Sequence, residues 1–338
     1  MGGPILVFIF SISQAARDVY FPYLFENHGF FDIVLIAFFI ATIFGWIVLL
    51  CIEPEQIPKM LKQWKLLTIA SMATAGGWIC YFFALNHIEA AIANALFSGA
   101  GPFVVILASY FGSGNQQTFV SKRLERFCYV GLFATLVAIV FVAVSGRSGL
   151  SQTLPREAFF GSLAALSSGA LMAASMLISR RLNESGVSAN AVIAARFIVG
   201  VLVATFIIMM QEQPSGIGFD KATLVVLMAA FCLIVLPGYA LQIGVSRTAP
   251  LTVQVIVPLS PILVFAAQLL DERTHYSAAT LICVLFYGIF ILSANVLRGW
   301  RDEPSNKNEL AIVSKRSEIA VEKLSRVVPL SDTDRNKR

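Results

Sequence analysis

Two charged residues stand near the end of the first apolar segment of the chain. Arg17 and Asp18 lie within residues 4–24, and Gln14 is one helical turn before Asp18. A charge at membrane depth costs on the order of a few kcal/mol, so such residues mark transport pathways or internal ion pairs. An arginine suits a carboxylate or phosphate, and an aspartate suits an amine or a proton. The alternative is that the helix ends early and the arginine snorkels to the membrane surface.

The orientation of these side chains can be estimated from helix geometry. Adjacent positions differ by about 100° around a helix, so we expect Arg17 and Asp18 not to point at one spot. Arg196 is a third candidate, because it lies deep inside the apolar segment 188–210 and cannot snorkel easily. It either attracts an anion or gates a pathway, or it is a fixed hydrogen-bonding hub for backbone carbonyls.

Aromatic residues form a second group of candidates. Trp78 and Tyr81 are three positions apart and share one helix face. Tyr239 and Gln242 occupy the corresponding region further along the chain. These side chains either line a cavity for a ligand or belong to the aromatic belt at the membrane surface.

Polar residues beside prolines form the third group. Asn94 and Ser98 are four apart and precede Pro102, while Gln254 precedes Pro258 and Pro261. A proline inside a helix frees backbone carbonyls, and a membrane tolerates free carbonyls only where they face protein or a water-filled cavity. The proline neighbourhoods are therefore candidates for a cavity wall or hinge, and interhelical hydrogen bonding is the alternative for the polar residues.

The rest of the chain must position these groups within a membrane. Of its 338 residues 57% are hydrophobic and 13% are charged, whereas a soluble domain carries about 25% charge. Apolar segments long enough to cross a bilayer alternate with short polar links. We therefore expect an all-α polytopic membrane protein with spans at 4–24, 32–51, 66–86, 89–111, 127–146, 159–179, 188–210, 222–242, 249–270 and 278–297.

Several classes of site are not indicated by the sequence. The five cysteines are dispersed in apolar segments, and the three histidines lie in or beside different links, so no metal site is expected. No Walker motif for ATP is present, and no cofactor is expected. Clustered carboxylates or a catalytic dyad would indicate an enzyme, and a ring of like charges would indicate a channel; neither pattern is found. The net charge of +5 reflects membrane topology rather than nucleic-acid binding.

The positive charges predict an orientation in the membrane. Lysines and arginines gather in every second link, beginning with Lys59, Lys62 and Lys65 and continuing with Lys122, Arg123 and Arg126. The positive-inside rule places these links in the cytoplasm, together with both termini. We expect an integral protein of the plasma membrane, which in bacteria is the inner membrane.

Two halves of the chain repeat one pattern. The stretch 81–111 resembles 239–270, with Pro102 and Pro261 at the same place, and 37–40 aligns with 195–198. Ten spans give five per copy, and an odd number inverts the second copy in the membrane. We expect inverted five-helix repeats at 1–146 and 147–297 around a central cavity. The polar tail 298–338 is expected to be disordered, with a short amphipathic helix as the alternative.

This pattern resembles the EamA-like branch of the drug/metabolite transporter superfamily over about residues 5–297. The resemblance rests on Ala84-Leu85 with Pro102 and on Pro261 followed by Asp271-Glu272-Arg273. The first half departs from the family, because Gly112-Ser113-Gly114-Asn115 stands where an acidic residue is usual. Arg196 matches a common arginine, which Phe38 replaces in the first copy. The resemblance implies ten helices, a central cavity and transport of small metabolites, often export of amino acids.

We therefore expect a secondary transporter, not an enzyme, that exports or exchanges small organic metabolites by alternating access. Its other expected partners are the lipid bilayer and a proton or counter-substrate, and it acts as a monomer or homodimer. An antiporter of nucleotide sugars or phosphosugars on the same plan is the alternative. That activity requires several cavity-facing cations, and only Arg17 and Arg196 lie at depth.

Overall fold

The computed structural model describes residues 2–27, 29–110, 123–150, 154–211, 221–248 and 250–298, and this part of the chain is helical without strands. Nine helices in these ranges are long and apolar enough to cross a membrane. This supports the predicted all-α polytopic architecture. The helices are α1 (Gly2–Asn27), α2 (Phe30–Ile52), α3 (Ile57–Lys62), α4 (Trp64–His87), α5 (Ala90–Tyr110), α6 (Arg123–Val144), α7 (Pro155–Glu184), α8 (Ala189–Arg196), α9 (Ile198–Met209), α10 (Lys221–Ala230), α11 (Leu236–Ser246), α12 (Pro250–Ile256), α13 (Ser260–Gln268) and an unlabelled helix, Ala278–Arg298.

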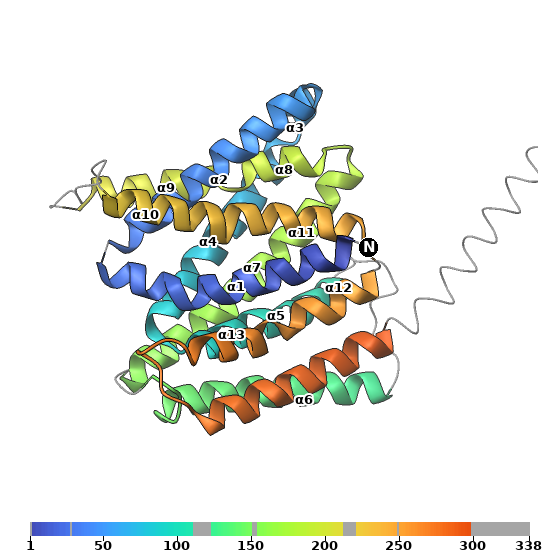
Figure 1. The fold of residues 1–338 in the computed structure, drawn as a ribbon. Helices are drawn as coiled ribbons and strands as arrows, with labels where there is room; N and C mark the ends of the chain where they lie inside the picture. Colours follow the sequence, from blue (N-terminus) through green and yellow to red (C-terminus); the bar gives the residue numbers. More distant parts are fainter. Residues whose placement is uncertain are drawn as a thin grey trace, which may run out of the picture.

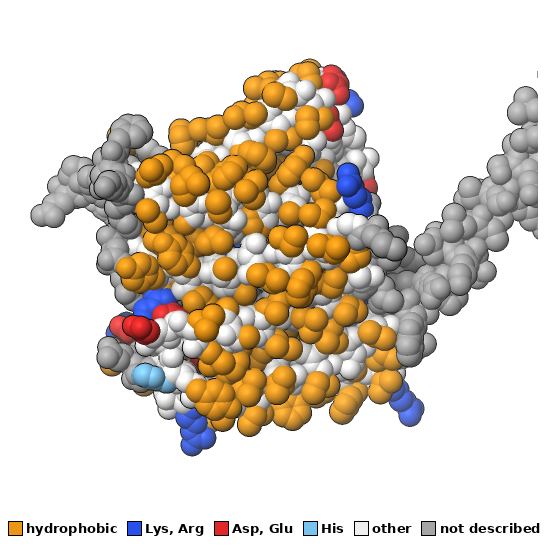
Figure 2. Space-filling model, in the orientation of Figure 1, with side chains coloured by type: hydrophobic (Ala, Val, Ile, Leu, Met, Phe, Trp, Pro, Cys, Tyr) orange, Lys and Arg blue, Asp and Glu red, His pale blue; other side chains and the backbone are white. Residues whose placement is uncertain are grey.

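Helices α1, α5, α6 and α11 lie roughly side by side along one direction, while α4 and α7 run obliquely behind them (Figure 1). Helices α2 and α8 lie at one edge of the bundle, and α6 and the helix Ala278–Arg298 lie at the other. Hydrophobic side chains cover the sides of the helices, while charged side chains gather near their two ends (Figure 2). An exposed apolar surface of this extent is what a lipid-facing protein presents.

The ninth predicted span, 249–270, is not one continuous helix. A short 3-10 segment, Val257–Leu259, separates α12 from α13, with Pro258 inside it and Pro261 at the start of α13. Proline has no backbone N–H and its ring displaces the carbonyl of the preceding turn, which explains the break. Pro102, in contrast, lies inside the continuous helix α5. Residues 112–115 and the tail from residue 299 lie outside the described ranges.

The link between α4 and α5 is very short. Helix α4 ends at His87, Ile88 adopts an extended backbone, and α5 begins at Ala90. The backbone N–H of Ala93 donates to the carbonyl of Glu89, which makes Glu89 the residue that starts the next helix. This geometry places Glu89 at the N-terminus of α5 rather than in a loop.

Helix α7 packs closely on α4 and α5 because its facing residues are small. Ser162, Ala165, Ser168 and Gly169 are buried along this face. The hydroxyl of Ser168 donates to the carbonyl of Gly77 at 2.6 Å. Small side chains allow such close approach of helix backbones. A hydrogen-bonded contact of this kind favours tight packing over a sliding surface.

We expect Gly169→Ala to destabilise the bundle by about 1–3 kcal/mol, because overpacking at a rigid contact forces backbone shifts. A Cβ at this position would overlap the carbonyl oxygen of Phe97, which belongs to the α5 backbone and cannot rotate away. Thermal unfolding in detergent measures the change. Gly101→Ala is the matched control, since its Cβ would meet only the Cβ of Ala173 at 4.0 Å. Equal melting temperatures for the two variants would contradict the packing described here.

Candidate functional site

The carboxylate of Asp18 is the centre of a buried polar cluster built from α1, α4 and α5. The hydroxyl of Tyr81 donates to its Oδ2 atom at 2.5 Å, and the amide of Asn94 donates to the same oxygen at 2.7 Å. The Asn94 amide also reaches the Tyr81 hydroxyl at 3.1 Å. Asp18, Asn94 and Tyr81 are 0%, 0% and 1% exposed. Side chains from α1 and from the consecutive helices α4 and α5 therefore converge on one carboxylate.

Arg17 joins this cluster directly, which corrects the expectation that it would point elsewhere. Its guanidinium donates through Nε at 2.9 Å and through one terminal nitrogen at 2.6 Å to Oδ1 of Asp18. The guanidinium carbon also lies 4.7 Å from the ring centroid of Trp78 and 5.5 Å from that of Tyr81. The Cβ atoms of Arg17 and Asp18 do point in directions about 100° apart around the helix. The long Arg17 side chain nevertheless bends back to its neighbour. Arg17 is 4% exposed, so it does not snorkel to the surface.

The broken span contributes the fourth element of the cluster. Ser260 is the first residue of α13, and its hydroxyl donates to Oδ1 of Asn94 at 2.9 Å. The proline-containing 3-10 turn Val257–Leu259 thus immediately precedes the residue that contacts Asn94, which in turn holds Asp18. Gln14 is buried one turn before Asp18, and Ser98 is half-buried one turn after Asn94. We call Arg17, Asp18, Tyr81, Asn94 and Ser260 the Asp18 cluster.

Arg196 lies at a different place, where α8 ends and α9 begins. Its Nε donates to the hydroxyl of Thr74 at 3.2 Å, and that hydroxyl is 2.7 Å from the hydroxyl of Ser175. The hydroxyl of Ser71 accepts from Val199 and donates to the carbonyl of Arg196, which bridges the interruption. Thr74, which contacts Arg196, lies one turn before Trp78, which contacts Arg17. Helix α4 therefore touches both arginines.

The structure does not place every predicted site residue in the Asp18 cluster. Tyr239 packs its ring against Phe44 of α2, with centroids 5.7 Å apart, rather than against the Asp18 cluster. The side chains of Gln242 and Gln254 lie outside the described part of the structure. The expected correspondence between the two halves therefore does not extend to the contacts of Tyr81 and Tyr239.

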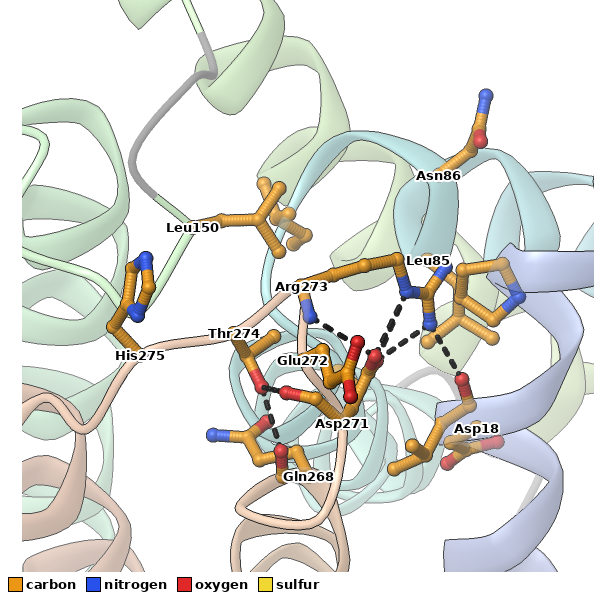
Figure 3. Close-up of a pocket in the computed structure, with 14 residues that line it drawn as sticks. Asp18, Leu85, Asn86, Leu150, Gln268, Asp271, Glu272, Arg273, Thr274 and His275 are labelled. Atoms are coloured by element: carbon orange, nitrogen blue, oxygen red, sulfur yellow. Dashed lines mark hydrogen bonds and ion pairs between the residues drawn. The ribbon is translucent and has the colours of Figure 1, made fainter. Parts of the chain in front are cut away.

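A pocket of about 330 Å³ opens beside the Asp18 cluster (Figure 3). Its wall includes Asp18, Asn86 and the segment that follows α13. In that segment Arg273 pairs with Asp271 at 2.6 Å and donates to the carbonyl of Val19 on α1 at 2.8 Å. Asp18 lies beside this pocket, and its side chain is fully buried. The cluster is therefore next to the pocket but covered in this conformation.

A second buried carboxyl, Glu89, was missed by sequence reasoning. It is 0% exposed and accepts hydrogen bonds from the Gly149 backbone at 2.8 Å, from the Thr280 hydroxyl at 2.7 Å and from the Gln268 amide. In the sequence it is the first residue of the predicted span 89–111, directly after a polar link, where a glutamate usually faces water. Only its place between two apolar segments hinted at burial.

Two acidic side chains near the pocket have shifted pKa values. Burial raises the pKa of Glu89, and its three hydrogen bonds only partly oppose that rise. For Asp271 burial also acts to raise the pKa, but the hydrogen bonds and positive charge of Arg273 outweigh it and lower the pKa. Asp271 thus stays ionised, while Glu89 binds a proton more readily than an ordinary glutamate. Across the described residues, no group of three or more His, Cys, Asp or Glu could hold a metal ion.

Comparison with known proteins identifies the fold alone. No family model and no curated protein matches the sequence. Ten chains of known structure match the fold. One of them, described as "Crystal structure of protein", aligns with a TM-score of 0.57 over 86% of this chain and 97% of its own length, at 17% sequence identity. The helical arrangement is therefore one that a solved protein of similar extent also adopts.

Proposed function

We propose that the chain is a secondary transporter that exports or exchanges small organic metabolites, such as amino acids, by alternating access. The observation that carries this proposal is the Asp18 cluster: a buried ion pair, held by α1, α4, α5 and α13, beside a pocket. Ionisable residues at membrane depth are functional candidates by default. The resemblance to the EamA-like family is part of the same proposal.

The packing of the helices supports an inverted-repeat arrangement. Helix α1 packs against α11 and α13, while α7 packs against α4 and α5. If α1 corresponds to α7, α4 to α11 and α5 to α13, these two sets of contacts are equivalent. The contact of α5 with α13 is its own equivalent under this exchange. Such pairing is what a pseudo-two-fold axis through the site would produce.

The depth of the Asp18 cluster fits a binding site that is accessible from one side of the membrane at a time. Asp18 lies nine residues before the end of α1 at Asn27, or roughly 13 Å at 1.5 Å per residue. The pocket opens beside the α4–α5 link and the segment after α13, which the positive-inside rule assigns to the outside. A substrate carboxylate would pair with Arg17 and a substrate amine with Asp18, so each charge of the pair gains a replacement partner.

A ligand screen by thermal shift tests this proposal. Purified full-length protein is heated with amino acids, nucleosides and vitamins, one class at a time. Bound ligand at 100 times its Kd stabilises by about 2.7 kcal/mol, so we expect one class to raise the melting temperature. Arg17→Lys should lose that response because it cannot form the same paired N–H bonds. Arg180→Lys is the control, since Arg180 sits in an exposed pair with Glu184. A response that Arg17→Lys retains would exclude the Asp18 cluster as the site.

A further inference from the structure

The donors that contact the Glu89 carboxyl within the described ranges are all neutral. A peptide N–H, a hydroxyl and a side-chain amide contact its two oxygens. Among the described residues no lysine, arginine or histidine forms an ion pair with it. Asp18 differs, because the guanidinium of Arg17 pairs with its carboxylate at 2.6 Å. Glu89 therefore lies in a buried site where no cation of the described residues pairs with it.

The charged groups on the elements around Glu89 are engaged elsewhere or exposed. On α4 the ring of His87 stacks on Phe83 and bonds to its carbonyl. In the α6–α7 link Arg147 is exposed, and at the start of α7 Arg156 lies over the Phe160 ring. After α13, Asp271 and Arg273 pair with each other. Glu157, Glu272 and His275 are exposed.

The hydrogen-bond network can accept Glu89 in either protonation state. With Glu89 ionised, the Thr280 hydroxyl donates to Oε2 at 2.7 Å. With Glu89 protonated, its O–H can donate to the Thr280 oxygen, and the Thr280 hydroxyl can turn to Ser277 at 3.1 Å. The Ser277 hydroxyl already donates to the carbonyl of Arg147 at 2.7 Å. A simple rotation of one hydroxyl thus keeps every buried group satisfied.

Glu89 also fastens together the links on the pocket face. It joins the start of α5 to the α6–α7 link through Gly149 and to the helix Ala278–Arg298 through Thr280. The backbone N–H of His275 donates to the carbonyl of Gly149 at 2.9 Å, which ties the segment after α13 to the same link. Opening this face would separate these links and expose the carboxyl to water.

Helix α13 connects Glu89 to the Asp18 cluster. Its first residue, Ser260, bonds to Asn94, and its last, Gln268, bonds to both Glu89 and the Ala91 backbone. The two contacts are eight residues apart, or roughly 12 Å along the helix. A rigid helix that touches both sites allows a change at one to bias the other.

We propose that Glu89 is a proton-binding site that fastens the pocket face when protonated and releases it when ionised. The inference rests on the proposed transport function and names its coupling ion as the proton. The closed face favours the proton because burial disfavours the charged form, and the open face lets water stabilise the carboxylate. Acid therefore favours closure, and rising pH through the raised pKa of Glu89 favours opening.

Infrared titration of the full-length protein in lipid nanodiscs tests this site without requiring a substrate. We expect a protonated-carboxyl band that disappears as pH rises, together with faster amide exchange in residues 145–150 and 271–277 after correction for the intrinsic pH dependence. Glu89→Gln should remove the band and keep the links protected at high pH. Glu157→Gln, an exposed acid at the start of α7, should behave like the wild type.

A band that persists in Glu89→Gln, or links that loosen with pH in that variant, would overturn the proposal. If Glu89→Gln does not fold, Thr280→Val carries the test. Loss of the hydroxyl that stabilises the carboxylate should move the titration midpoint to higher pH, and an unchanged midpoint overturns the assignment. Vesicle flux separates the two proposals: a titrating Glu89 in a protein without any substrate flux contradicts transport, not proton binding.

Discussion

Asp18→Asn is expected to abolish transport and to destabilise the folded protein. The Arg17 side chain is 5% exposed and would lose its anionic partner. Removal of one member of a buried ion pair costs about 3–5 kcal/mol, because the other charge is left uncompensated. Arg17→Met should cost a similar amount. The double variant Arg17→Met/Asp18→Asn should recover much of the stability, since no buried charge remains, but should not recover transport.

Thermal unfolding of the four proteins in detergent measures this coupling, and vesicle flux measures activity. Glu184→Gln is the matched control for stability, because Glu184 pairs with Arg180 on α7 while both side chains are more than 60% exposed. Exposed pairs contribute about 0–1 kcal/mol. Additive losses in the double variant would show that Arg17 and Asp18 do not act as a pair.

Asn94→Leu is expected to uncouple α13 from the rest of the site and to stop transport. Asn94 donates to Asp18 and accepts from Ser260, so one amide joins α1 to the broken helix. Leucine has a similar volume but leaves the Ser260 hydroxyl without its acceptor, and it removes one of the two donors to Oδ2 of Asp18, where Tyr81 remains. Each unsatisfied buried group costs about 1–3 kcal/mol. We expect faster amide exchange in α12 and α13 and a lower melting temperature.

Ser98→Ala is the matched control for this variant. Ser98 lies one turn further along the same helix and is half-buried, so the substitution perturbs α5 without touching the Asp18 cluster. Its exchange and melting should remain close to those of the wild type. Equal loss of α13 protection in both variants would mean that Asn94 does not specifically hold α13.

Much of the Asp18 cluster could be predicted from the sequence. Arg17 and Asp18 are charges in an apolar segment, and Asn94 is an amide in another, so each had to find partners in the protein interior. Trp78 and Tyr81 share a helix face, and the structure turns that face toward Arg17. The prolines Pro258 and Pro261 marked the place where a 3-10 turn interrupts the α-helix, although Pro102 lies inside a continuous helix.

Other features depend on tertiary packing and could not be predicted in the same way. Helix geometry gave the directions of the Cβ atoms of Arg17 and Asp18, but not the bend of a long arginine back to its neighbour. Glu89 lies beside a polar link, and only the folded structure shows that the neighbouring links bury it. Pattern similarity suggested equal roles for Tyr81 and Tyr239, yet Tyr239 packs on Phe44. Neither pattern nor spacing reports which helix faces which.

Counterflow in proteoliposomes tests the central claim most directly. Vesicles that contain the full-length protein are loaded with an unlabelled compound from the stabilising class and diluted into a labelled trace of it. The account predicts transient accumulation of label that requires Asp18, is lost in Asp18→Asn and is retained in Glu157→Gln. Accumulation that persists in Asp18→Asn, or its absence from the wild type for every stabilising compound, would contradict a transport site at the Asp18 cluster.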